Sequence, residues 1–137
     1  MKNLLSGLIF FVLIVISTQA QVSIITNTSS PEMKLDGIKL SNIFSLVITK
    51  WENGNKITLF DNSNGDARTK FYNFISKDPI TIKKEWLKKQ LMGEGKAPEV
   101  LGSDSEVISK VASTPGAIGF VSSSSVNNTV KVLLEIK

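Results

Sequence analysis

The sequence has no cysteine and no histidine among its 137 residues. Without cysteine there is no disulfide, no thiolate nucleophile and no cysteine-linked lipid anchor. Without histidine the chain lacks the most common general base and the most common metal ligand. Asp104 and Glu106 lie close together, but a helix start explains both carboxylates. We therefore expect no enzyme, no catalytic residue, no metal site and no cofactor.

A strong charge of one sign is also missing. Lysine and arginine number 16 and aspartate and glutamate 12, which gives a formal net charge of +4. A surplus this small, spread along the chain, predicts no nucleic-acid partner. It is compatible with an anionic ligand or an acidic partner, and equally with charge that only keeps the protein soluble.

The longest early apolar run, Leu8–Ile16, is much shorter than the roughly 20 residues that span a bilayer. Lys2 precedes it, and the small or polar residues from Ser17 to Ala20 follow it. This order is typical of a secretory signal peptide over residues 1–20, cleaved before Gln21. We expect a periplasmic protein without a lipid anchor, which contacts the membrane only through the signal peptide before cleavage, and a single domain over residues 21–137.

The rest of the chain alternates between strand and helix patterns. Short apolar runs predict strands over 22–26, 57–60, 117–121 and 130–136. Helical spacing predicts helices that begin at Asp36, near Gly65 or Asp66, at Thr81 after Pro79 has closed the preceding helix, and at Ser103. Gly93, Gly95 and Pro98 predict a loop. The order favours an α/β domain with helices packed on a mixed sheet.

Apolar spacing also predicts which side chains face the core. The expected inward residues are Leu40, Ile43, Phe44 and Val47 in the first helix, Ala67, Phe71, Phe74 and Ile75 in the second, and Ile82, Trp86, Leu87 and Leu91 in the third. Lys83, Lys84, Lys88 and Lys89 are expected on the outer face of the third helix as a solvated surface. Tyr72 follows inward Phe71 and is expected at a surface.

Three segments together resemble the phosphate-type substrate-binding proteins of ABC transporters, a periplasmic-binding-protein-like family. They are Ile43-Phe44 with Thr49-Lys50-Trp51 and Asn53-Gly54; Arg68 with Phe71, Tyr72, Trp86 and Gly93; and the run from Pro115 to Val121. The resemblance implies two α/β lobes with the ligand clamped between them. The chain holds enough residues for one lobe, so we expect a single lobe of this kind.

The resemblance also implies where an anion would bind. Relatives carry Ser-Gly-Thr before the Arg-x-x-Phe helix and an arginine a few residues upstream. Gly65, Asp66 and Ala67 stand at the first three positions here, and Asp61 stands at the arginine position. Both hydroxyls are gone, although the amides of a helix start still attract anions. The candidate ligand-binding residues are Ser63, Gly65, Asp66, Ala67 and Arg68.

Arg68 has two interpretations at this point. It can form a bidentate pair with an oxyanion, or a salt bridge with Asp66, Asp61 or Glu52. The carboxylates at Asp61 and Asp66 favour the salt bridge and weaken phosphate binding.

Two functional hypotheses follow. The first is a periplasmic solute-binding protein that captures phosphate or another small oxyanion for an ABC permease. The second is an interaction module or adaptor in a cell-envelope assembly, which kept the lobe and lost the ligand.

Overall fold

The computed structural model describes residues 11–14 and 21–137. Most of the predicted signal peptide lies outside the described residues. Residues 11–14 are exposed and form no helix or strand. In these described ranges, no helix has the length and apolar character needed to cross a membrane.

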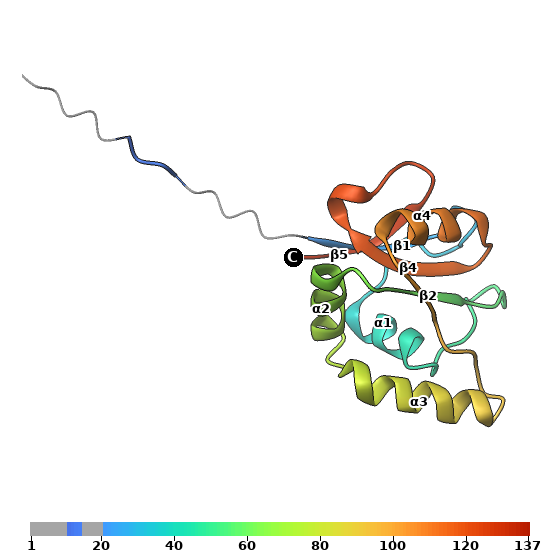
Figure 1. The fold of residues 1–137 in the computed structure, drawn as a ribbon. Coiled ribbons are helices and arrows are strands. Elements are labelled where there is room, and N and C mark those ends of the chain that lie inside the picture. The colour runs from blue at the N-terminus through green and yellow to red at the C-terminus, as the bar shows by residue number, and fades with distance from the viewer. Residues whose placement is uncertain (1–10, 15–20) are drawn as a thin grey trace, which may run out of the picture.

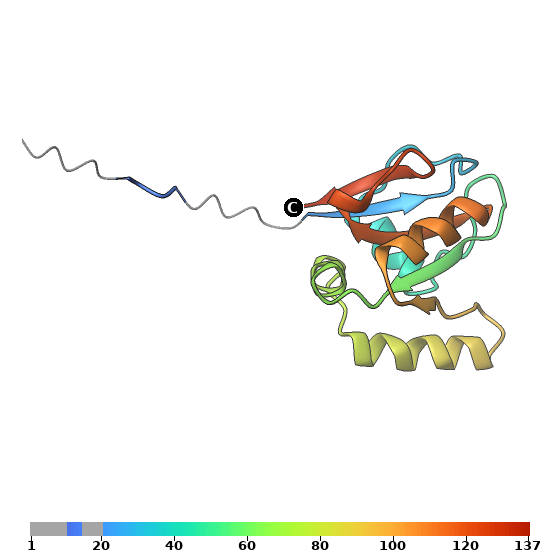
Figure 2. The same ribbon diagram turned by 45° about the horizontal axis from the view of Figure 1, so that its top comes forward.

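The domain is built on one five-stranded mixed sheet, seen in Figures 1 and 2. Its strands are β1 (Val22–Thr26), β2 (Thr58–Asn62), β3 (Glu99–Leu101), β4 (Ala117–Ser122) and β5 (Lys131–Ile136), in the spatial order β3-β2-β4-β1-β5. The β2 strand runs parallel to β3 and β4, whereas β1 runs antiparallel to β4 and β5. The predicted α/β class with a mixed sheet is confirmed.

Helices cover both faces of this sheet (Figures 1 and 2). On one face lie α1 (Gly37–Phe44), α2 (Gly65–Phe74) and α3 (Pro79–Leu91), and on the other lies α4 (Asp104–Ser113). The split follows from strand alternation, because neighbouring residues of one strand point to opposite faces. In β1, Ile24 joins the core under α1 to α3, and Ile25 joins the core under α4.

An aromatic cluster fills the larger core. The rings of Phe71 in α2 and Phe120 in β4 stack with centroids 3.9 Å apart, and Phe44 in α1 meets Phe71 edge-on at 4.7 Å. Offset stacking and edge-to-face contacts are the favoured geometries of such rings. These contacts fix α2 against the sheet and so fix where α2 begins.

Several elements start or turn where the sequence indicates. The side chain of Asp36 accepts a hydrogen bond from the amide of Lys39 at 2.7 Å and caps α1. The side chain of Ser103 caps α4 through the amide of Glu106 at 3.2 Å, while the Glu106 carboxylate accepts from the amide of Gly102. Ser103 and Glu106 therefore form a capping box at the predicted helix start, with its return bond moved by one residue.

Some expected inward residues are exposed instead: Val47, Phe74, Leu87 and Leu91. Val47 lies beyond the end of α1 at Phe44, so helical spacing no longer places it. Leu87 and Leu91 lie on the outer side of α3. In the opposite direction, Tyr72 was expected at a surface and is only 2% exposed.

Two boundaries also differ from expectation. Pro79 does not close α2, which ends at Phe74; it is the first residue of α3, where its missing amide costs no hydrogen bond. Within the segment expected to be a loop after α3, Glu99–Leu101 forms the edge strand β3.

Candidate functional site

Three parallel strands bring their carboxyl ends to one edge of the sheet. The segment after β2 leads through Ser63 and Asn64 into α2, and β3 leads through Gly102 and Ser103 into α4. Serines 123–125 follow β4, which ends at Ser122. The amide of Ser63 donates to the carbonyl of Leu101 at 2.9 Å, which joins the first two segments. We call this region the carboxyl edge; in open α/β sheets it is the usual place for ligands.

The structure brings all five candidate residues to this edge. Ser63, Gly65 and Asp66 are exposed, Ala67 is buried and Arg68 is half-buried. Helix α2 begins at Gly65, as predicted. Their role as ligand contacts stays a prediction.

The first turn of α2 is not closed by its own cap. Asn64 occupies the N-cap position, but its side chain makes no capping hydrogen bond. Its side-chain nitrogen, Nδ2, instead donates to Asp104 Oδ1 at 3.2 Å. Within the described residues, no hydrogen bond joins the Asp66 carboxylate to the first amides of α2 either. The first amides of α2, at the positive end of the helix dipole, therefore have no side-chain cap among the described residues.

Arg68 is paired inside the protein. Its Nη1 lies 2.7 Å from Oδ2 of Asp61, whose side chain is completely buried. The hydroxyl of Tyr72 donates to the same oxygen at 3.0 Å, and the Arg68 guanidinium lies over the Tyr72 ring at 5.0 Å. Of the salt bridges considered for Arg68, the one with Asp61 is present.

The buried carboxylate of Asp61 also affects the acidity of Tyr72. Burial, together with the charge and hydrogen bond of Asp61, raises the pKa of Tyr72 above its ordinary value, although Arg68 acts in the opposite direction. Tyr72 therefore remains a neutral hydrogen-bond donor. The second carboxylate oxygen of Asp61, Oδ1, is buried and accepts no hydrogen bond from the described residues.

A second carboxylate, that of Asp104, gathers donors from two other segments of the same edge. Asp104 Oδ1 accepts from the side-chain amides of Asn62 at 2.7 Å and Asn64 at 3.2 Å. Oδ2 accepts from the amide of Ser122 at 3.2 Å and the hydroxyl of Ser125 at 2.7 Å. Burial alone would raise the pKa of Asp104, but these hydrogen bonds outweigh it and lower the pKa.

Sequence reasoning missed this role of Asp104 and assigned the residue only to a helix start. A usable signal existed, since Asn62, Asn64 and the serine run all follow strands predicted to be buried. Polar side chains after neighbouring parallel strands meet at one edge. In this arrangement Asp104 takes up side-chain donors that could otherwise bind an external anion. The backbone amides at the start of α2 remain without a side-chain partner.

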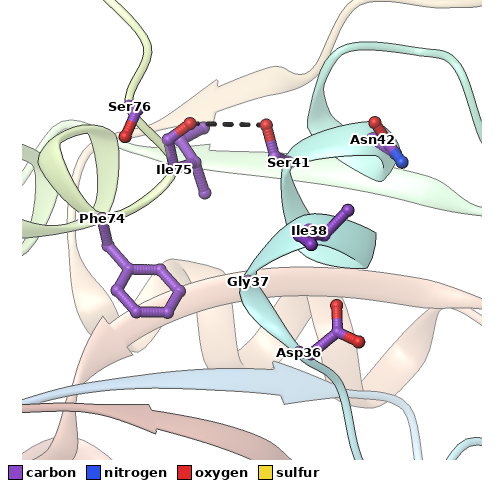
Figure 3. A pocket seen from close by; sticks show the side chains of 8 residues that line it. All are labelled: Asp36, Gly37, Ile38, Ser41, Asn42, Phe74, Ile75 and Ser76. Atoms are coloured by element: carbon purple, nitrogen blue, oxygen red, sulfur yellow. Dashed lines mark hydrogen bonds between the residues drawn. The ribbon is translucent and has the colours of Figure 1, made fainter.

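A separate hollow lies between the start of α1 and the end of α2 (Figure 3). It is an open depression of about 630 Å³, lined by Asp36, Gly37, Ile38, Ser41, Asn42, Phe74, Ile75 and Ser76. One hydrogen bond crosses it, from the Ser41 hydroxyl to the Ile75 carbonyl at 3.3 Å. It shares no residue with the predicted anion loop. Among the described residues, no group of acidic side chains could hold a metal ion.

Comparison with known proteins gives a clear result for the fold. No family model matches the chain, and no curated protein matches it. Among solved structures, a proposed phosphate ABC transporter substrate-binding protein from Clostridium perfringens, solved with bound phosphate, superposes with a TM-score of 0.67 at 18% identity. An ABC-type phosphate transport receptor from Vibrio cholerae gives 0.65 at 21%, and PstS from Borrelia burgdorferi gives 0.61 at 19%.

The chain has the fold of these phosphate-type substrate-binding proteins. Each match covers 83% of this chain but only 44%, 45% and 46% of the respective solved chains. The chain therefore spans less than half the length of the proteins it matches. The expected resemblance is confirmed at the level of the fold. The three neighbours are binding proteins by description, which agrees with the expectation of no enzyme and does not by itself test it.

Proposed function

We propose that this chain is an exported, periplasmic solute-binding protein that holds a small oxyanion, with phosphate as the first candidate, at the amides of Gly65, Asp66 and Ala67. One observation carries the proposal: Asn64 turns its side chain to Asp104 and leaves the start of α2 uncapped. The fold shared with phosphate-binding neighbours supports the same position. An ABC permease is the partner that this function implies.

The site is a weak one for free phosphate. The guanidinium of Arg68 is neutralised by Asp61, so the charge-assisted bidentate contact is not available. The exposed Asp66 carboxylate in the first turn repels a second anion. A single lobe also covers a ligand from one side only. Tight capture therefore needs a second surface, supplied by another lobe or by the permease.

The test is a titration of the ligand-stripped protein with phosphate, sulfate and molybdate, followed by amide chemical shifts in ¹⁵N NMR spectra. We expect shifts of the Gly65, Asp66 and Ala67 amides at millimolar ligand. The variant Gly65→Ser/Asp66→Gly, called the restoring variant, brings back the first two residues of the Ser-Gly-Thr pattern and keeps Ala67, whose side chain is buried; it should bind at least tenfold more tightly. The space around Gly65 admits a side chain, because nothing lies within 4 Å of an added Cβ.

The matched control is Glu94→Ser, which removes an equally exposed carboxylate away from the carboxyl edge. It should leave the titration unchanged. Flat spectra at the α2 amides in both the natural sequence and the restoring variant would remove the proposal.

The alternative function is an interaction module or adaptor in a cell-envelope assembly. The side-chain donors of the edge already have partners inside the protein, which favours this alternative: Asp61 pairs with Arg68, and Asp104 accepts from the side chains of Asn62, Asn64 and Ser125. The polar side chains of such an edge already have hydrogen-bond or ion-pair partners when no ligand is bound. A protein that shows no anion response but forms a defined complex with a second envelope protein would fit this alternative.

A further inference from the structure

Helix α3 is held to the domain by one side only. Ile82 and Trp86 are buried in the core, and Trp86 Nε1 donates to the carbonyl of Phe44 at 2.6 Å. On the same side, Nζ of Lys89 donates to the carbonyl of Ser45 at 3.0 Å. These contacts anchor α3 to the end of α1. The figures show α3 along an outer border of the domain, away from β1 and β5 (Figures 1 and 2).

The other side of α3 carries a second apolar stripe that the domain does not bury. Ile80, Leu87 and Leu91 are 69%, 58% and 79% exposed. They are separated by seven and then four residues, which places them in one row along the helix. An aliphatic row of this exposure is unusual on a helix whose opposite side already packs on a core.

Lysines accompany this row, and all of them are exposed. Lys84 lies within the row, four residues after Ile80, and Lys83 and Lys88 lie on its two sides. The acidic residue of α3, Glu85, lies on a different side and is half-buried. We call Ile80, Lys83, Lys84, Leu87, Lys88 and Leu91 together the outer stripe.

The outer stripe follows the seven-residue pattern of a helix pair. With Ile80 and Leu87 at d positions, Leu91 falls at an a position and Lys84 at the other a position. Lys83 then occupies g and Lys88 occupies e, the positions that select a partner by charge. Ile82 and Trp86 fall at f and c, on the side that the domain itself buries.

We propose that the outer stripe of α3 is a docking surface for an amphipathic helix of another protein that carries acidic residues beside its apolar row. The partner's apolar side chains cover Ile80, Leu87 and Leu91, and its carboxylates face Lys83 and Lys88. A polar Lys84 within the seam fixes the register. The short row makes the contact a weak or transient one.

Charge argues against a second copy of this chain at the same place. In a parallel pair, Lys83 of one helix would face Lys88 of the other, and Lys84 would face Lys84. The shape of the stripe argues against a bilayer. Interfacial helices present a broad apolar face, often with aromatic residues, whereas this row is narrow, lacks aromatic residues and has Lys84 in its middle.

The test selects partners without assuming one. A displayed library of helical peptides, about three heptads long with leucine at a and d and Glu, Gln or Lys at e and g, is panned on the immobilised protein. We expect Glu to be enriched at e and g at least tenfold over Lys. Fluorescence anisotropy of the selected peptide then measures its affinity.

Three variants make the result specific. Leu87→Ser/Leu91→Ser should abolish enrichment, and its exposed positions leave the fold intact, which circular dichroism checks. Lys83→Glu/Lys88→Glu should reverse the preference to Lys-flanked peptides. Lys110→Glu, which changes an exposed lysine of α4, is the matched control and should behave as the natural sequence.

Enrichment that is independent of the flanking residues, or that survives Leu87→Ser/Leu91→Ser, would overturn the proposal. So would binding to phosphatidylglycerol vesicles with no peptide enrichment, or a concentration-dependent dimer lost on Leu87→Ser/Leu91→Ser. The outer stripe shares no residue with the predicted anion loop. A flat phosphate titration therefore leaves this result untouched, and the two proposals fail separately.

Discussion

Replacement of Arg68 by Gln tests the strength of the ion pair between Arg68 and Asp61 at the carboxyl edge. The change leaves the carboxylate of Asp61 completely buried without the guanidinium 2.7 Å away. Breaking a buried ion pair by removing one partner typically costs about 3–5 kcal/mol. Arg68 is 20% exposed, and the Tyr72 hydroxyl still donates to Asp61, so we expect a smaller cost than this, about 2–3 kcal/mol.

The reasoning predicts a different cost when the charge of Asp61 is removed first. In an Asp61→Asn background no buried carboxylate is left unpaired, so Arg68→Gln should cost about 1 kcal/mol or less. The difference between the two backgrounds, about 1–2 kcal/mol, is the coupling energy of the pair. A double-mutant cycle measures it without counting the packing of the arginine stem.

The assay is equilibrium urea unfolding followed by the fluorescence of Trp51 and Trp86, which are both buried. The control Lys110→Gln removes an exposed lysine on α4 and should stay within about 0.5 kcal/mol of the natural sequence. A cost for Arg68→Gln below about 0.5 kcal/mol, or the same cost in both backgrounds, would show that Asp61 does not hold Arg68. Arg68 would then be available to an external anion.

Three further predictions concern the same edge and its supports. Asp104→Asn should cost about 1–2 kcal/mol at neutral pH, since hydrogen bonds to a charged acceptor are lost. Because the folded pKa lies below the ordinary value of 3.8, this stabilisation is complete above that value and disappears as the pH falls through the folded pKa; urea unfolding at several pH values should show the two proteins converging in acid. Gly116→Ala should unfold or severely destabilise the domain in thermal melts, because the φ angle is +77° and the new Cβ would clash with the Lys56 carbonyl oxygen. The control Gly54→Ala, at φ +85° in open space, should cost only about 1–2 kcal/mol. Tyr72→Phe should cost about 1–2 kcal/mol by urea unfolding, and an unchanged midpoint would contradict the hydrogen bond to Asp61.

Local chemistry explains which parts of the fold the sequence predicts well. Asp36 and Ser103 cap the helices that follow them, because a cap depends on only a few neighbouring residues. The edge strand Glu99–Leu101 escaped prediction because its pairing with β2 is a contact between distant segments. Its first two residues are exposed, so no apolar run marks it.

The faces of α3 show a limit of apolar spacing. The residues Ile82, Trp86, Leu87 and Leu91 satisfy a helical pattern, and a single buried face was expected to hold them all. The structure divides them into two rows, and only Ile82 and Trp86 are buried. The bond from Trp86 to the Phe44 carbonyl orients the helix, and no spacing rule contains that contact.

The candidate site divides in the same way. Its position after β2, and the start of α2 at Gly65, follow from a turn-rich segment between two apolar elements. The partner of Arg68 could be narrowed to three carboxylates but not chosen, because the choice depends on which side of β2 is buried with α2. The cluster around Asp104 joins residues 62–64, 104 and 122–125, and only the tertiary fold brings them together.

The two internal carboxylates have opposite consequences for an anion at the carboxyl edge. Asp61 removes the cation that a phosphate would bind most strongly, which lowers affinity. Asp104 draws away the side chain of Asn64, which would otherwise cap α2, and so leaves the helix amides uncapped. An edge with uncapped helix amides but no free guanidinium favours an anion that is also bound by groups outside this domain. A phosphate held at the same time by a second protein surface meets that requirement, whereas phosphate alone in water is expected to bind only weakly.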